Sequence, residues 1–367
     1  MSAAKVNNIH YLRGAASLLV VCYHLKFYLN NIYDVKMLGD ILFKFGAFGV
    51  DLFFVISGFV ICLATEKKEN ARPTAFILHR FFRIYPLLVF CMTFFYFLFN
   101  KGSEITPFLR GVIPLNANYS AGAPFFGWNI LIPAWTLTYE LAFYSIFLFA
   151  MTISHKNRIL ISTFLILFFI ISFQWLFSSS VTLSAYNNNS FLEDSWLHAP
   201  VTFLASPLFI DFIYGMVIYL LFKHIKENHI KENHITLHSW LSVFLVFVLC
   251  SSFVLAILYI NAGHGPLRWG ILGALIVISL VILEIQRRPS DIKPLALLGD
   301  ISYSLYLSHE IVIKIITKNV VEHGYGEKLA GVSSFVMMIL ICIIVAICLN
   351  KFIERPFIRL GRRILLK

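Results

Sequence analysis

The first apolar segment of the chain carries two residues that could do chemistry, Arg13 and His24, separated by ten residues. At 100° per residue, eleven steps along a helix return to within about 20° of the starting direction, so both side chains share one helix face roughly 16 Å apart along the axis. Ionisable groups inside a membrane are costly to keep. A functional site is therefore the default interpretation of this pair, and a hydrogen-bonded packing role for His24 is the alternative.

Two carboxylates are predicted at the depth of His24. If the first segment runs outward, His24 lies past the membrane midplane toward the outside. The second and fourth apolar segments then run inward, which puts Asp51 about one and a half turns below the outer surface and Glu140 in the first turn of its helix. We therefore expect His24, Asp51 and Glu140 to lie together in the outer half of the protein.

A basic cluster precedes the third apolar segment, with the sequence His79-Arg-Phe-Phe-Arg-Ile-Tyr-Pro86. We expect Pro86 to begin this helix, since the missing N–H of proline costs nothing in the first turn. Arg80 and Arg83 would then stand at a helix N-terminus, where they oppose the macrodipole and favour a bound anion such as phosphate. The alternative is that they only hold this loop on the cytoplasmic side.

The elements that position these residues are predicted to be membrane-spanning helices. With 59% apolar residues, 13% charged residues and a mean hydropathy of +0.79, the composition excludes an ordinary soluble domain. The fold class expected is all-α, a single polytopic membrane domain over 1–367. Windows of about 20 apolar residues predict ten spans, near 11–29, 46–65, 84–100, 137–153, 158–177, 200–222, 239–260, 268–285, 301–317 and 330–350.

Most Lys and Arg residues fall in every second connection and in the C-terminal tail, whereas the loop at 178–199 has none. The positive-inside rule therefore places both termini in the cytoplasm. The net charge of +11 is explained by this topology and by attraction to anionic membrane lipids, so no nucleic-acid partner is expected.

Three loops and the cysteines complete this outline. The Pro- and Gly-containing loop 101–136 suits an ordered periplasmic cap, and loop 178–199, with amides, carboxylates and aromatics, suits either a sugar or a hydrated connector. The cytoplasmic loop 223–238 contains a tandem Ile-Lys-Glu-Asn-His repeat at 225–229 and 230–234, interpreted as a duplication in a solvated loop. The six cysteines have no metal-like spacing, so no metal is expected, and reduced packing residues are the interpretation.

Further polar residues lie inside the predicted spans. Ser302, Tyr306 and His309 share a helix face, which either lines the same cavity or forms hydrogen bonds between helices. Glu310 and Lys314 have the spacing of an ion pair on that helix. The pair Ser57-Gly58 is expected to allow close helix packing rather than to supply a nucleophile, and Asp211 has no partner that the sequence identifies.

Five motifs in order resemble the acyltransferase-3 family of bacterial membrane O-acyltransferases. The resemblance covers essentially the whole chain. The motifs are Arg13-X10-His24, Gly49-Val-Asp-Leu-Phe-Phe-Val-Ile-Ser-Gly-Phe59, Arg80-X-X-Arg83-Ile-Tyr-Pro86, Trp135-Thr-Leu-Thr-Tyr-Glu140 and Gly299-Asp-Ile-Ser-Tyr-Ser-Leu-Tyr-Leu-Ser-His309.

The resemblance implies a bacterial inner (plasma) membrane protein with ten core helices. It also implies an acyl-coenzyme A donor from the cytoplasm and commonly a carbohydrate acceptor on the periplasmic side. Some members carry a fused periplasmic esterase-like domain, and this chain, which ends after its tenth predicted span, resembles the stand-alone type. His24 is implied to be catalytic, with Arg13 in the same site. Arg80 and Arg83, with Tyr85 of the same motif, are implied to hold the donor, while Trp135, Tyr139, Tyr303, Tyr306 and His309 are candidates for binding the acceptor.

The function expected from these observations is transfer of an acyl group, acetyl in the first instance, from acyl-CoA to a hydroxyl of a cell-envelope glycan such as O-antigen or exopolysaccharide. The acceptor is either lipid-linked or already polymerised. His24 acts either as a general base, with Glu140 or Asp51 orienting its imidazole, or as a transient acyl-imidazole that relays the acyl group outward. A transporter or flippase is the rival interpretation, because carriers also bury charges, although no inverted repeat is found.

Overall fold

The computed structural model describes residues 6–66, 72–102, 104–186, 191–192, 195–231, 239–258, 263–286, 291–322 and 330–365, apart from the side chains of 228–231, 239 and 320–322. Residues 232–234 of the tandem repeat, and the amides and carboxylates singled out in loop 178–199, lie outside these residues. The described chain contains helices and no strand. The longer helices are α1 (Asn7–Leu25), α3 (Gly49–Ala64), α4 (Pro73–Phe99), α6 (Trp135–Ile153), α7 (Arg158–Ser178), α9 (Ile210–Lys231), α10 (Ser239–Leu258), α11 (Ile271–Gln286), α12 (Lys293–Glu322), α13 (Gly331–Leu349) and α14 (Arg355–Leu365).

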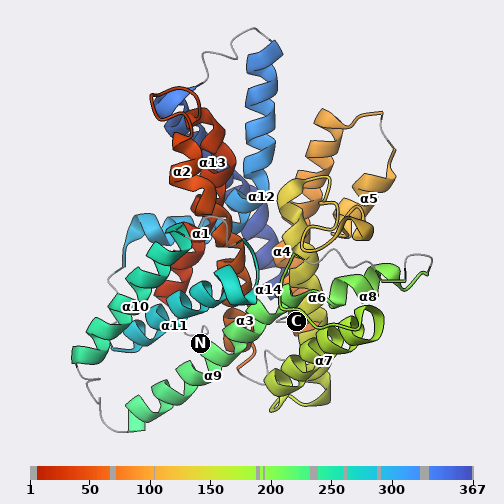
Figure 1. The fold of residues 1–367 in the computed structure, drawn as a ribbon, viewed down its shortest axis with the longest axis vertical. Coiled ribbons are helices and arrows are strands. Elements are labelled where there is room, and N and C mark those ends of the chain that lie inside the picture. The colour runs from red at the N-terminus through yellow and green to blue at the C-terminus, as the bar shows by residue number, and fades with distance from the viewer. Residues whose placement is uncertain are drawn as a thin grey trace.

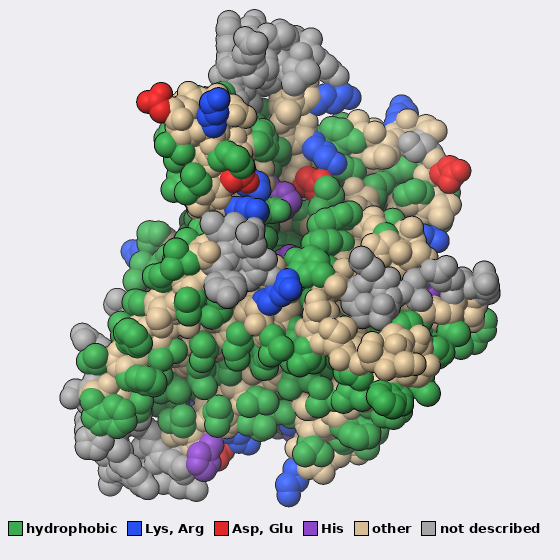
Figure 2. Space-filling model, viewed as in Figure 1, with side chains coloured by type: hydrophobic (Ala, Val, Ile, Leu, Met, Phe, Trp, Pro, Cys, Tyr) green, Lys and Arg blue, Asp and Glu red, His purple; other side chains and the backbone are tan. Residues whose placement is uncertain are grey.

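Eight helical stretches of the described chain are long and apolar enough to cross a membrane, and each corresponds to a predicted span. The other two predicted spans, 11–29 and 301–317, fall on α1 and α12, which are long enough but more polar. Hydrophobic side chains cover much of the face shown in Figure 2. Large apolar residues such as Phe247 and Leu258 of α10 are about two-thirds exposed, which is favourable only where lipid replaces water.

The helices pack around α3. It contacts α1, α9 and α11, while α10 packs on α11 along one flank and α7 packs on α6 along the other (Figure 1). Short helices fill the connection between α4 and α6, namely α5 (Thr106–Val112), η4 (Tyr119–Ala121) and η5 (Ile132–Ala134). Residues 104–134 thus fold into short helices joined by turns, and their role as a periplasmic cap stays a prediction.

Two predicted boundaries are wrong, and proline explains both. The third span begins at Pro73 and not near 84, because Arg72 before Pro73 is extended (ψ 132°) and Pro86 is accommodated inside the helix. The predicted span 200–222 is interrupted at Ser206, which precedes Pro207 and is also extended (ψ 123°). Its parts are α8 (His198–Leu204), η6 (Pro207–Phe209) and α9.

Close contacts at glycine set the helix spacing. A Cβ atom on Gly58 would lie 2.1 Å from the carbonyl oxygen of Phe212, and one on Gly215 would lie 2.0 Å from that of Val55. The predicted packing role of Gly58 is confirmed, since α3 and α9 approach backbone to backbone only because both positions lack a side chain.

Replacing Gly215 with alanine should destabilise the helix pair, because the added methyl group meets backbone atoms that cannot rotate away. We expect a loss of about 2–3 kcal/mol, at the upper end of the overpacking range. Thermal unfolding in detergent measures it. Gly273→Ala is the matched control, since its Cβ has no neighbour closer than 3.5 Å. Equal melting temperatures for the two variants would contradict the packing described here.

Candidate functional site

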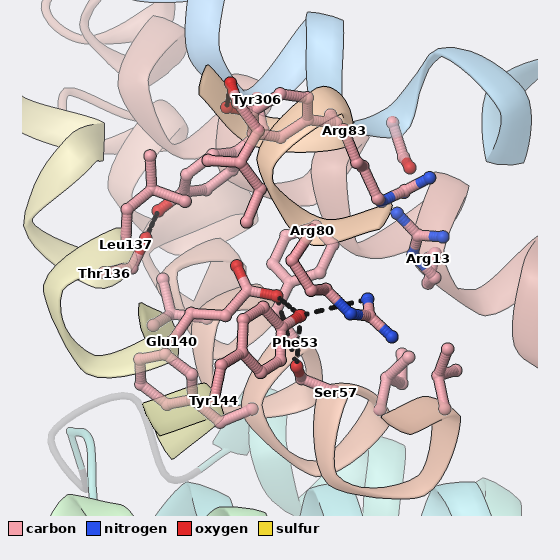
Figure 3. Close-up of a pocket in the computed structure, with 17 residues that line it drawn as sticks. Arg13, Phe53, Ser57, Arg80, Arg83, Thr136, Leu137, Glu140, Tyr144 and Tyr306 are labelled. Carbon is pink, nitrogen blue, oxygen red and sulfur yellow. Dashed lines mark hydrogen bonds between the residues drawn. The ribbon is translucent and has the colours of Figure 1, made fainter. Parts of the chain in front are cut away.

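A cavity of about 190 Å³ lies between α1, α3, α4, α6 and α12, with apolar walls and polar side chains projecting into it (Figure 3). Arg13, Arg80 and Arg83 reach it from α1 and α4, while Glu140 and Tyr144 reach it from α6. Ser57, Thr136, Ser302, Tyr303 and Tyr306 complete its polar lining.

One carboxylate organises the polar side of this cavity. Ser57 Oγ donates a hydrogen bond to Glu140 Oε1 over 3.1 Å, and the hydroxyl of Tyr144 donates to the same oxygen. Arg80 Nη1 lies 3.5 Å from the Tyr144 hydroxyl, and its guanidinium group lies 4.8 Å from the centre of that ring. Within the described residues, Arg80 is thereby held in the cavity by an aromatic face and a hydroxyl rather than by a direct ion pair.

A second cavity of about 440 Å³ adjoins the first. We call it the basic vestibule. It is lined by His10, Arg13, Arg83, Gly299, Asp300, Asn350, Glu354, Arg355, Ile358, Arg359 and Arg362. Arg13 and Arg83 line both cavities and therefore mark their junction.

In the part of the chain that the structure describes, the two arginines at the junction have no direct counter-ion. Their guanidinium groups lie close together in Figure 3 and repel each other, and among the residues that the structure describes neither forms an ion pair or hydrogen bond. Glu140 and Glu354 act on Arg13 only through longer-range attraction. Two half-buried cations beside one another are stabilised by an anionic ligand, and planar guanidinium groups suit phosphate oxygens.

The C-terminal helix α14 is held where its arginines face the vestibule. Buried Glu354 accepts hydrogen bonds from Ser304 Oγ (2.6 Å) and Asn350 Nδ2 (3.0 Å), which fixes the turn before α14 against α12. Gly361 packs so closely on α4 that a Cβ there would lie 2.7 Å from the ring of Phe82. These contacts bring the arginines of α14 beside Arg83 of α4.

The expectation that Arg80 and Arg83 stand at a helix N-terminus is wrong. They are the eighth and eleventh residues of α4, where the backbone N–H groups are already used inside the helix. The predicted anion site therefore depends on guanidinium groups alone. Tyr85, the third predicted donor residue, stacks on Phe81 with ring centres 5.0 Å apart and lines neither cavity.

His24 does not lie with Asp51 or Glu140, so the expected cluster of these three residues is wrong. Its ring is centred 5.0 Å from that of His309 on α12, and it lines neither cavity. A hollow beside α12, around which His, acidic and basic side chains gather, is visible in Figure 2.

Asp51 is instead a buried structural carboxylate. It accepts hydrogen bonds from His264 Nδ1 (2.7 Å) and from the backbone N–H of Gly265 (3.0 Å), and it neighbours Asp211. Asp51 thus joins α3 to the turn before α11, whereas neither carboxylate oxygen of the neighbouring Asp211 has a hydrogen-bond partner among the described residues. His264 carried no signal, because it stands alone between glycines.

The remaining predicted acceptor residues divide between cavity and core. Tyr303 and Tyr306 line the first cavity, and their hydroxyls donate to the carbonyls of Ile84 and Pro133. Trp135 and Tyr139 lie in an aromatic core beneath the 101–136 segment, where the Tyr139 hydroxyl donates to Pro124 O. The predicted ion pair of Glu310 with Lys314 is confirmed at 3.0 Å.

Sequence reasoning missed the contribution of α14 and the link from Ser57 to Glu140. The arginines at 355, 359 and 362 recur at three- and four-residue spacing, which places them on one helix face, but they also satisfy the positive-inside rule. Among the described residues, no group of three or more His, Cys, Asp or Glu side chains is arranged to hold a metal.

Comparisons with known proteins agree with the family that the sequence motifs resemble. Residues 6–350 match the family model of an acyltransferase domain. The exopolysaccharide production protein ExoZ of Rhizobium meliloti (strain 1021) is 25% identical over 334 residues, which cover 87% of this chain and 92% of that protein. BcsY of Komagataeibacter xylinus, named as a candidate membrane-bound transacylase, is 25% identical over 354 residues, covering 89% and 78%. No solved structure matches the chain.

The two carboxylates Asp51 and Glu140 should respond differently to substitution. Asp51→Ala leaves His264 and the N–H of Gly265 without an acceptor, so we expect a loss of stability of about 2–4 kcal/mol. Glu140→Gln keeps an oxygen acceptor for Ser57, so its free energy of unfolding should lie within about 1 kcal/mol of the parent value. Thermal unfolding of purified protein distinguishes them, and a stable Asp51→Ala variant would show that this carboxylate is not structural.

Proposed function

Because the chain belongs to the family of the acyltransferase domain, we propose that it transfers an acyl group, acetyl, from acyl-CoA to a hydroxyl group of a cell-envelope polysaccharide. The donor enters from the cytoplasm through the basic vestibule, and His24 serves the transfer step. The charge asymmetry of the loops supports an inner-membrane location with this vestibule on the cytoplasmic side.

The observation that carries the proposal is the junction formed by Arg13 and Arg83. An acyl-CoA has phosphates at one end and a neutral, flexible arm ending in a thioester at the other. The arginine-lined vestibule suits the phosphates, and the adjoining cavity, with its apolar walls and hydroxyl groups, suits the arm. Arg13 and Arg83 lie where the charge of such a ligand would end and its neutral part would begin.

The relatives support the class of acceptor. One is named for exopolysaccharide production and another as a transacylase, and the described chain offers hydroxyl-bearing and ionic side chains around the His24 and His309 pair. Lys26 pairs with Asp40 (2.8 Å) on one side of His24. A carbohydrate hydroxyl needs such hydrogen-bonding surroundings when it enters a membrane protein.

The transfer step is a nucleophilic substitution at the thioester. His24 accepts the proton of the sugar hydroxyl, the oxygen bonds to the thioester carbonyl carbon, and the carbon–sulfur bond breaks. The imidazolium then returns its proton to the departing thiolate. In the alternative with an acyl-imidazole, a nitrogen of His24 attacks the thioester first. A labelled acyl group should then be trapped on the parent protein but not on the His24→Ala variant.

The vestibule can be tested by comparing two adjacent arginines of α14. Arg362 lines the vestibule and Arg363 does not, although both are exposed. Arg362→Ala should weaken acetyl-CoA binding about 10-fold through loss of a phosphate contact, whereas Arg363→Ala should not. Calorimetric titration in detergent measures both. Equal affinities would place the phosphates elsewhere, and no binding to the parent chain would favour a carrier of glycans.

The catalytic role of His24 can be tested on cells. We expect O-acetyl signals in the NMR spectrum of surface polysaccharide when the parent chain is expressed. His24→Ala at equal membrane abundance should lose them, because no base remains to take the hydroxyl proton. Equal acetylation in both samples would refute the role of His24. Absence of O-acetyl signals from both samples would refute the assignment of acetyl as the transferred group or of surface polysaccharide as the acceptor.

A further inference from the structure

The helices α1 and α12 lie in parallel register, and this register brings two histidines together. Gly14 and Gly299 form the close contact of the pair, since a Cβ on Gly14 would lie 2.7 Å from Gly299 N. His24 and His309 each follow ten residues later, roughly 15 Å along their helices, and their rings are centred 5.0 Å apart with a 50° tilt. The contact between the histidines is therefore set by the backbone.

The hydrogen bonds of His309 define its tautomer. Its Nδ1 atom lies 2.7 Å from the carbonyl oxygen of Tyr306 and 3.3 Å from that of Leu305. A carbonyl oxygen only accepts, so Nδ1 carries the proton and Nε2 of the neutral ring presents a lone pair. His309 is fully buried, and Nε2 has no partner among the residues that the structure describes. A buried acceptor in this state needs an N–H or O–H donor.

His24 is the donor that the surroundings leave available. The Tyr306 hydroxyl is 3.2 Å from Pro133 O and donates there, Glu310 is paired with Lys314, and Lys26 is paired with Asp40. Within the described chain neither ring nitrogen of His24 has a hydrogen-bond partner. Two imidazoles joined by an N–H···N bond of about 2.9 Å have centres roughly 5 Å apart, so rotation of the His24 ring suffices to form it.

We propose that His309 is the positioning residue of the transfer reaction, in the place that the sequence suggested for Glu140 or Asp51. This inference rests on the proposed function. Nε2 of His309 accepts the N–H of His24, so the other nitrogen of His24 is unprotonated and faces the sugar hydroxyl. When His24 takes the hydroxyl proton, the same bond stabilises the imidazolium, and His309 itself stays neutral throughout. A neutral partner adds no further charge to the membrane interior.

Two substitutions of His309 separate positioning from packing. His309→Leu removes the acceptor, and we expect kcat for acetyl-CoA-dependent acetylation of the polysaccharide to fall about 100-fold or more with the KM for acetyl-CoA unchanged. His309→Gln places an amide oxygen near the position of Nε2, so its kcat should be at least about 10-fold higher than that of His309→Leu. Ser308→Ala, at the neighbouring buried position, is the control and should keep full activity.

The outcomes distinguish this inference from the proposed function. A parent chain that transfers no acetyl group refutes the proposed function. A parent that is active and sensitive to His24→Ala, with His309→Leu equally active, refutes the role of His309 alone. Equal losses in His309→Leu and His309→Gln with equal melting temperatures also refute it.

A spectroscopic measurement tests the inference even if the His309 variants fail to fold. In ¹⁵N-histidine solid-state NMR of the parent chain, we expect a protonated Nδ1 and an unprotonated Nε2 for His309, with the Nε2 signal shifted in His24→Phe. A protonated Nε2, or a signal indifferent to His24, would overturn the inference.

Discussion

Positive charge without a direct counter-ion, at Arg13 and Arg83, is the constraint on which the structure depends. The half-buried pair lies where two cavities meet, and no ion pair or hydrogen bond to either guanidinium group is present in the described part of the chain. Such an arrangement is costly unless a ligand supplies the negative charge. The helices therefore have to be held together by other contacts, which glycine approaches and the buried Glu354 provide.

Within the described chain, the ionisable residues considered for the site at the sequence level lie in three separate centres with different tasks. The first gathers three arginines and Glu140 around a cavity, the second is the pair of His24 and His309, and the third is Asp51 with its two donors. Tyr306 connects the first two, because it lines the cavity and its ring lies 6.2 Å from that of His309. Only the third is occupied fully by structural hydrogen bonds, which is why we assign it to stability.

Periodicity and composition predicted what depends on one helix at a time. Eight of the predicted spans and the pair of Glu310 with Lys314 follow from the pattern of residues along the chain. Contacts between helices did not follow. Depth alone grouped Asp51 and Glu140 with His24, although helices at the same depth can face different neighbours. The predicted span also began too late, near residue 84 instead of Pro73. A search for apolar segments excludes Arg80 and Arg83, although these arginines face an internal cavity within the same helix.

The central claim, that donor phosphates in the vestibule place the thioester end in the cavity, is tested most directly by affinity labelling. Bromoacetyl-CoA should alkylate the thiol of a Ser57→Cys variant in which the exposed Cys250 and Cys348 are replaced by alanine. We predict one CoA adduct at position 57 by mass spectrometry, prevented by excess acetyl-CoA. A variant that binds acetyl-CoA yet forms no adduct there, or an adduct that acetyl-CoA does not prevent, would contradict the account.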